Sequence, residues 1–269
     1  MSWLKQVLGH DKAVIAMVHF PPLPGTPLYD DRESLSPILR RVAHDVDALQ
    51  TGGVDGLMFC NENDRPYVMK ADPVGVAVMA RTIGELLPRI QLPFGIDVIW
   101  DPVAAIAIAK ATGGQWVREV FTGAYASDMG LWDTHCGETL RYRKYIDASH
   151  VRLLFNISGE FAAPLAPRGL PDVARSVSFS SIPDALCISG AMTGAEVSCE
   201  DLAQVKRAVP HMVVFANTGT RVDNVAEKLS VADGVIVGTS LKVDGNTWNP
   251  VDAERVVAFM SQVRSARGE

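Results

Sequence analysis

The chain has 269 residues, of which 48% are hydrophobic, so it is long enough to bury a full core. Its net charge of −6 comes without a cluster of Lys and Arg, which argues against nucleic acid and anionic membranes as partners, because both require a basic surface. No apolar run approaches the ~20 residues that cross a bilayer, and the N-terminus does not have the pattern of a signal peptide, so we expect a cytoplasmic protein without membrane insertion.

Short apolar runs alternate with amphipathic segments along the chain, which is typical of parallel strands joined by helices. We predict strands at residues 13–18, 56–59, 94–99, 116–121, 152–157, 185–189, 213–216 and 234–237. Helices are predicted between them, at residues 36–50, 73–87, 102–111, 134–146, 171–177, 199–208, 222–229 and 251–263. No linker divides the chain, so the pattern predicts one (β/α)₈ barrel domain over residues 1–269, with a doubly wound sheet as the competing fold.

A proline-rich segment at residues 19–30 follows the first predicted strand and contains Pro21, Pro22, Pro24 and Pro27. Proline fixes φ and forces the preceding residue toward an extended conformation, so the segment is semi-rigid. We expect this loop to lie over the mouth of the barrel as a rim or lid. The alternative is a surface loop that is rich in proline only for stability.

The last two predicted strands both end in small polar turns. The strand at 213–216 leads into Asn217, Thr218 and Gly219, and the strand at 234–237 leads into Gly238, Thr239 and Ser240. Such turns offer backbone N–H groups and hydroxyls without a bulky side chain, which suits a phosphate or carboxylate. Because the loops after strands seven and eight of such barrels commonly bind phosphate, we predict a phosphate site here. The alternative is that the glycines simply end the strands.

Three segments carry a resemblance to a known family: the Pro-Pro-Leu-Pro-Gly run at 21–25, the Phe-Thr-Gly-Ala run at 121–124, and the closing run at 232–242. With these segments the chain resembles the BtpA family over nearly its whole length. The resemblance implies a TIM-type barrel with a phosphate-binding end, related to phosphosugar and nucleotide-precursor barrels. It implies no reaction, since the family is named after a protein linked to photosystem I biogenesis. The chain departs from the family pattern at Cys60, at Glu119 and at residues 159–165.

Ionisable side chains at the ends of predicted strands are the candidates for catalysis. Glu119 and Asp97 stand within apolar runs on neighbouring strands, and partial burial would bring a carboxyl pKa into the general acid/base range. His19 ends the first strand and could act as an acid, a base or a ligand. Glu119 could instead point outward, Asp97 could only tether a loop, and His19 could be a structural hydrogen-bonding group.

Polar groups that do not titrate complete the predicted binding site. Asn61 and Asn156 can orient a sugar hydroxyl or carbonyl, and Gly190 follows the sixth strand. Glu62 and Asp64 are expected to be solvated loop charges, with Arg65 as a close partner. Metal-ligand motifs are absent from the sequence, although Mg²⁺ bridging a substrate phosphate and one carboxylate would leave no motif, so Mg²⁺ stays open as a cofactor.

Two functions follow from these features. The first is an enzyme that uses acid/base chemistry on a small phosphorylated metabolite, a sugar phosphate or a nucleoside 5′-phosphate, as an isomerase, a lyase or an N-glycosidic hydrolase. The alternative is a non-catalytic assembly factor built on an inherited barrel. The sequence leaves open whether the chain forms a homo-oligomer.

Overall fold

The computed structural model describes residues 2–32 and 34–269. Its centre is a closed barrel of eight parallel strands in the order β1-β11-β10-β9-β7-β4-β3-β2. These strands are β1 (Ala13–His19), β2 (Gly56–Cys60), β3 (Phe94–Asp97), β4 (Trp116–Glu119), β7 (Arg152–Asn156), β9 (Ala185–Ile188), β10 (Val214–Ala216) and β11 (Gly234–Val237). The predicted (β/α)₈ barrel is confirmed, and each predicted strand overlaps one strand of the barrel, although β3 and β4 end two residues earlier than predicted.

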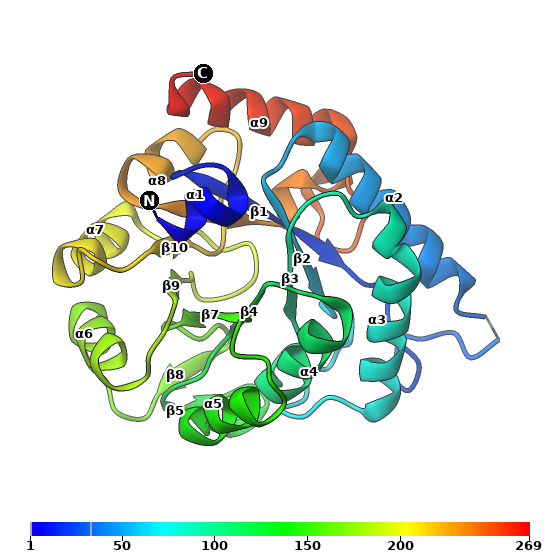
Figure 1. Ribbon diagram of the computed structural model, residues 1–269, viewed down its shortest axis with the longest axis horizontal. Coiled ribbons are helices and arrows are strands. Elements are labelled where there is room, and N and C mark those ends of the chain that lie inside the picture. Colours follow the sequence, from blue (N-terminus) through cyan, green and yellow to red (C-terminus); the bar gives the residue numbers. More distant parts are fainter. Residues whose placement is uncertain (1, 33) are drawn as a thin grey trace.

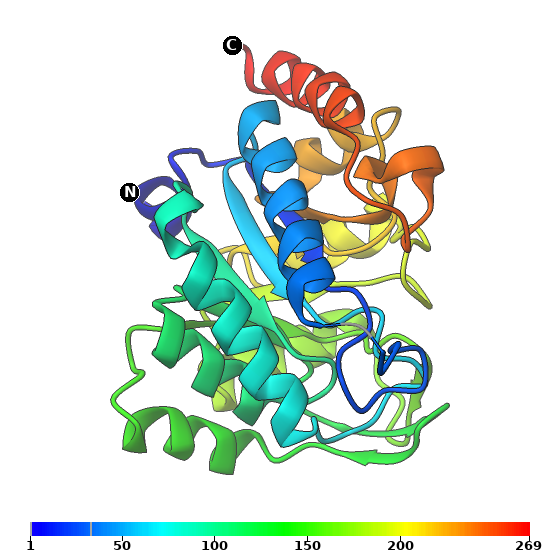
Figure 2. The ribbon, with the colours of Figure 1, turned by 90° about the vertical axis from the view of Figure 1, so that its right-hand side faces the viewer.

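Helices surround the strands on the outside of the barrel (Figure 1). They are α2 (Ser36–Gly52), α3 (Pro73–Leu86), α4 (Pro102–Thr112), α5 (Cys136–Tyr145), α6 (Leu170–Ser180), α7 (Cys199–Ala208), α8 (Val225–Val231) and α9 (Ala253–Arg267), with short 3₁₀ turns η1 (Leu87–Arg89), η2 (Thr239–Leu241) and η3 (Val243–Gly245). Figure 2 shows α2 between α3 and the C-terminal α9. Helix α8 begins later than predicted, because Asn224 accepts a hydrogen bond from the Arg221 backbone N–H and holds the preceding residues in a turn.

The buried side chains form two separate cores, as expected where strand residues alternate between two faces. The outer core lies between strands and helices, and the inner core fills the barrel. A short N-terminal helix that was not predicted, α1 (Trp3–Leu8), adds Leu4 and Leu8 to the inner core. Its Leu8 packs against Gly56 at the start of β2, so α1 closes the N-terminal end of the barrel. Access to the barrel interior is therefore left to the C-terminal end.

A small antiparallel sheet of β5 (Ala124–Ser127), β6 (Gly130–Asp133) and β8 (Ala162–Pro164) was also not predicted. It is built from the segments that follow β4 and β7. Tyr125 and Trp132 anchor it, with ring centroids 5.4 Å apart, and Trp132 packs against Trp100 at 4.8 Å. These strands are too short to give a clear alternation of apolar and polar residues in the sequence.

An aspartate stands directly before three of the barrel strands and ties each to its neighbour. Asp55, before β2, accepts the backbone N–H of Val14 at 2.7 Å. Asp184, before β9, likewise accepts from Leu153 at 2.8 Å. Asp233, before β11, accepts the backbone N–H of Val214 at 2.8 Å. Each carboxylate satisfies a buried backbone donor that the parallel ladder leaves open where the strand begins, which fixes the register of neighbouring strands.

The inner core is packed tightly enough that Gly95→Ala should destabilise the protein. A Cβ at Gly95 would lie 2.1 Å from the Trp116 indole, which is fully buried. We expect the free energy of unfolding in urea to fall by about 1–3 kcal/mol, the usual effect of overpacking. Gly84→Ala in α3 is the control, since its Cβ meets nothing within 4 Å and should stabilise the helix by about 0.5–1 kcal/mol. A Gly95→Ala protein as stable as the wild type would show that Trp116 moves freely.

Candidate functional site

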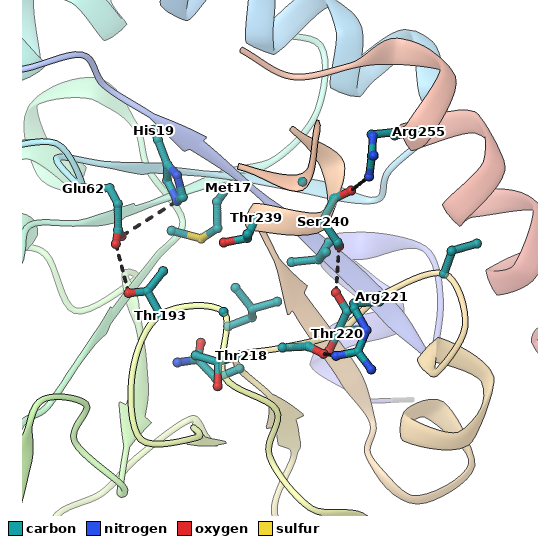
Figure 3. A pocket seen from close by; sticks show the side chains of 18 of the residues that line it. Met17, His19, Glu62, Thr193, Thr218, Thr220, Arg221, Thr239, Ser240 and Arg255 are labelled. Atoms are coloured by element: carbon teal, nitrogen blue, oxygen red, sulfur yellow. Dashed lines mark hydrogen bonds and ion pairs between the residues drawn. The ribbon is translucent and has the colours of Figure 1, made fainter. Parts of the chain in front are cut away.

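A cavity of about 380 Å³ opens at the C-terminal end of the barrel. Its lining comes from the ends of β1 and β4 and from the loops that follow β2, β7, β9, β10 and β11. Figure 3 shows this cavity with His19, Glu62 and Thr193 on one side and with Thr220, Arg221 and Ser240 on another. The open end of the fold is therefore where polar and charged side chains converge.

The two loops predicted to bind phosphate lie side by side in this cavity. Thr218 and Gly219, after β10, line it together with Gly238 and Ser240, after β11. The Ser240 hydroxyl donates to the backbone carbonyl of Thr220 at 2.7 Å and so joins the two loops. The predicted turns are thus parts of one surface.

Gly219 allows a third loop to approach the same surface. Its φ is +68°, and a Cβ there would lie 2.3 Å from the Cα of Glu196. Only glycine combines this backbone conformation with such a close approach. Two arginines lie at the rim: Arg255 donates to the Ser240 carbonyl at 3.3 Å, and Arg221 pairs with Glu196 at 3.0 Å. The cavity therefore has a side rich in hydroxyl, amide and guanidinium groups.

Glu62 and His19 form a second group in the lining. Glu62 was expected to be a solvated loop charge, and that expectation is wrong, because its side chain is buried. One of its oxygens accepts hydrogen bonds from Thr193 at 3.0 Å and from Tyr67 at 3.2 Å, and the other lies 3.9 Å from His19 Nε2. Burial raises the pKa of Glu62, and burial together with the charge of Lys242 holds the pKa of His19 well below its usual value.

Arg118 and Glu160 form a third group, and neither residue was predicted to be functional from the sequence. Arg118 points into the barrel, bonds to Asp97 and lies 3.5 Å from Glu160. Asn156 donates to Glu160 at 2.8 Å, and Asn217 donates to it at 3.3 Å. Burial raises the pKa of Glu160, although the neighbouring guanidinium opposes the shift. This network joins β3, β4, β7 and β10 at the floor of the cavity.

Glu119 and Asp97 are both buried, but neither lines the cavity. Strand alternation places Glu119 on the same face as Val117 of the outer core, whereas Arg118 shares the inner face with Trp116. Glu119 accepts a hydrogen bond from the Val120 backbone at 3.3 Å. Burial and the charge of Asp97 raise its pKa well above the ordinary value. Asp97 is bonded to Arg118 of the cavity lining, but the lining includes neither carboxyl group of this pair.

Asn61 and the proline-rich loop belong to a different part of the C-terminal end. Asn61 accepts the backbone N–H of Ile99 at 2.8 Å and donates to Asp64 at 3.1 Å. Leu23 of the loop is buried, and its N–H donates to Asp64. Residues 23–27 of the loop line a small pocket of about 80 Å³ beside α3, and of residues 19–30 only His19, at the end of β1, lines the main cavity. The loop is held to one side of the barrel mouth.

The remaining predicted residues make structural contacts. Asp64 is half-buried, and burial raises its pKa to about 6. Its expected partner Arg65 instead stacks over the Trp248 ring at 3.4 Å. The backbone N–H of Gly190 donates to the Thr218 hydroxyl at 2.7 Å, so this residue supports the loop after β10 from behind. Lys242 turns away from the cavity and pairs with Asp45 at 3.1 Å.

Across residues 2–32 and 34–269, no helix is long and apolar enough to span a membrane. In the same part of the chain, no group of three or more His, Cys, Asp or Glu side chains is placed to hold a metal ion.

A closed (β/α)₈ barrel with a polar cavity at its C-terminal end defines the class as a TIM-barrel protein. The BtpA family model matches residues 10–265, and the chain belongs to this family. It is 48% identical over 267 residues to the putative sgc region protein SgcQ of Escherichia coli, covering 99% of this chain and 100% of that one. It is 33% identical to the photosystem I biogenesis protein BtpA of Synechocystis, covering 96% and 90% of the two chains.

Solved structures agree on the fold. The chain resembles (S)-3-O-geranylgeranylglyceryl phosphate synthase from Thermoplasma acidophilum, solved in complex with its substrate sn-glycerol-1-phosphate, with a TM-score of 0.63 and 14% identity over 98% of this chain and 99% of the other. It also resembles phosphoribosyl anthranilate isomerase from Thermococcus kodakaraensis, with a TM-score of 0.56 and 14% identity over 94% and 99% of the chains.

Glu119 should lower the stability of the protein as the pH rises. The pKa of Glu119 in the folded protein is raised above the ordinary 4.5. The contribution of this group to the free energy of unfolding is therefore fully present below about pH 4.5 and is lost as the pH rises toward the folded pKa. Glu119→Gln removes this loss, and we expect its melting temperature relative to the wild type to increase with pH above 4.5. Thermal unfolding over a pH series measures the difference. The exposed Glu85→Gln is the control, and a Glu119→Gln difference that does not change with pH would contradict the prediction.

Proposed function

We propose that the protein is an enzyme that uses acid/base chemistry on a small phosphorylated metabolite, a sugar phosphate or a nucleoside 5′-phosphate. The observation that carries the proposal is that the loops after β10 and β11 line the same cavity as the buried carboxyl groups of Glu62 and Glu160. Binding energy from a phosphate at one end of a substrate can hold its reacting carbons against such groups. The cavity volume is within the range of sites for small molecules.

The chemistry of the two loops supports a phosphate. Among the described residues, the backbone N–H groups of Thr218 and Gly219 donate to no protein acceptor. Arg221 and Arg255 bring guanidinium groups to the rim, although Arg221 is paired with Glu196 and Asp223 and Arg255 lies near Asp252. A guanidinium has five N–H donors, so each can also donate to an anion. The two structural neighbours named above carry phosphorylated compounds in their names, but at 14% identity they support only the fold.

The name of one relative favours a second function, a non-catalytic assembly factor. Such a factor would have no need for Glu62 and Glu160 inside a cavity, where burying a carboxylate without full compensation costs stability. The two functions differ in one measurable property, since an assembly factor would not bind a small phosphorylated compound in the barrel mouth.

A panel of sugar phosphates and nucleoside monophosphates, screened by thermal shift with and without Mg²⁺, tests the proposed anchor. A ligand at about 100 times its Kd stabilises the folded state by about 2.7 kcal/mol. Gly238→Asp places a carboxylate at the anion site and should abolish this shift. Because a Cβ at Gly238 lies 3.1 Å from His19 Cε1, Gly238→Ala is the matched steric control and should retain most of the shift. Equal shifts for Gly238→Asp and the wild type would remove these loops as the anchor.

A further inference from the structure

The order of the strands arranges the polar groups of the cavity in sequence around its wall. Since β1 pairs with both β11 and β2, His19 lies between the loop after β11 and Glu62. A Cβ at Gly238 would meet His19 Cε1 at 3.1 Å, and His19 Nε2 is 3.9 Å from Glu62. A substrate anchored by its phosphate at the loops after β10 and β11 would therefore present its nearest carbons to His19 and Glu62.

Beyond these two residues, the floor of the cavity has unused hydrogen-bonding capacity. Arg118 Nε and Asn217 Oδ1 are buried and have no hydrogen-bond partner within the described part of the chain. The same holds for the Thr220 hydroxyl near the phosphate loops. A buried polar atom without a partner costs stability, so these atoms are suited to a ligand that carries hydroxyl or carbonyl oxygens along its length.

The lining also limits the kind of chemistry. No lysine is among the described residues that line the cavity. Lys242 is bound to Asp45, and Lys228 is bound to Glu196 at 2.6 Å, so neither amine is placed to form a Schiff base with a substrate. Burial raises the pKa of the Cys60 thiol, which keeps it a poor nucleophile. Asp223 also lines the cavity, but it is exposed and lies 3.2 Å from Arg221. The buried groups left to move protons in the cavity are the Glu62 and Glu160 carboxyls and the His19 imidazole.

Glu62 is better placed than Glu160 to take a proton from a substrate carbon. Glu160 is already bound by Asn156 and Asn217 and lies beside the Arg118 guanidinium, which stabilises its charged form. Glu62 has no guanidinium or ammonium group within ion-pair distance among the described residues and is oriented by neutral hydroxyl donors. A carboxylate in such surroundings is a stronger base than one held by an arginine.

We propose that Glu62 and His19 are the catalytic acid/base pair of this cavity, and that the substrate is a phosphorylated hydroxy-aldehyde or hydroxy-ketone whose adjacent carbons exchange a hydrogen. The inference rests on the proposed function and adds a substrate class and a reaction to it. Arg118, Asn217 and Glu160 then hold the oxygens at the end of the substrate far from the phosphate.

The step balances without a further reactant. The Glu62 carboxylate takes the proton from the carbon that bears the hydroxyl, and the C–H electron pair forms a carbon–carbon double bond. The carbonyl π pair moves to its oxygen, which receives a proton from the uncharged His19 imidazole. Glu62 then returns its proton to the neighbouring carbon, and His19 recovers a proton from the other oxygen. The product is the isomer with carbonyl and hydroxyl exchanged.

Exchange of substrate hydrogen with D₂O tests this step directly. The sugar phosphates that raise the melting temperature are incubated with the protein in D₂O, and NMR follows deuterium at the carbon next to the carbonyl. Wild-type protein should incorporate deuterium and form the isomer. Glu62→Gln should slow incorporation by about 100-fold or more while keeping the thermal shift, as expected for loss of a catalytic base. Glu85→Gln, an exposed residue of α3, is the matched control and should exchange at the wild-type rate.

Three outcomes would overturn the inference. The first is an exchange rate for Glu62→Gln within about threefold of the wild type, far from the loss expected of a catalytic base. The second is a loss for Glu119→Gln as large as for Glu62→Gln, which would return the catalytic role to Glu119. The third is binding of phosphorylated compounds without exchange at any carbon, which would leave the proposed function standing. If no phosphorylated compound binds at all, the proposed function fails as well.

Discussion

The pairing of β1 with β11 is the constraint on which the rest of the molecule depends. Four successive residue pairs, from Ala13 with Gly234 to Ala16 with Val237, join the two ends of the strand series and close the barrel. Closure brings His19 next to Gly238, although more than 200 positions separate them in the chain. Because every barrel strand is parallel, all the loops that follow the strands meet at one end. The cavity is a direct consequence of this closure.

Charge is distributed unevenly inside this frame. Four carboxyl groups are buried near the single guanidinium of Arg118, those of Glu62, Asp97, Glu119 and Glu160. One cation cannot compensate four carboxylates in a medium of low polarity. Either some of these carboxyl groups are protonated, or their burial lowers the stability of the folded state. Arg118 lies closest to Asp97 and Glu160, which leaves Glu62 and Glu119 with the weakest compensation. Only Glu62 of these two faces the cavity, and this difference in position, more than any difference in burial, separates a candidate catalytic group from a structural one.

Much of the fold could be predicted from the sequence, and so could His19 and the two polar turns of the cavity, but the carboxyl groups and the arginines that line it could not. The strands were recognisable because their residues are apolar on both faces, and the turns at Thr218 and Gly238 because they follow such strands. Because both faces of these strands are apolar, the sequence does not indicate to which face a polar residue points. In β4 it could therefore not show that Arg118 faces inward and Glu119 outward. Glu62 stands in a polar run that resembles a solvated loop, and of the two hydroxyl groups that donate to it, that of Thr193 comes from 131 positions away. Such long-range contacts leave no local pattern.

The loop after β9 connects the loop after β10 to Glu62. Thr193 and Gly194 line the main cavity, whereas Gly190 and Glu196 line a neighbouring one of about 470 Å³, so the loop forms the wall between them. It is held on one side by the close approach of Gly219 to Glu196 and on the other by the hydrogen bond from Thr193 to Glu62. The position of the carboxyl group is thus set from across the barrel, by a segment that also touches the loop after β10. A shift of the loop after β10 would therefore reach Glu62 through this wall. Under the proposed function, the same contacts would connect the binding of a phosphate with the position of the catalytic base.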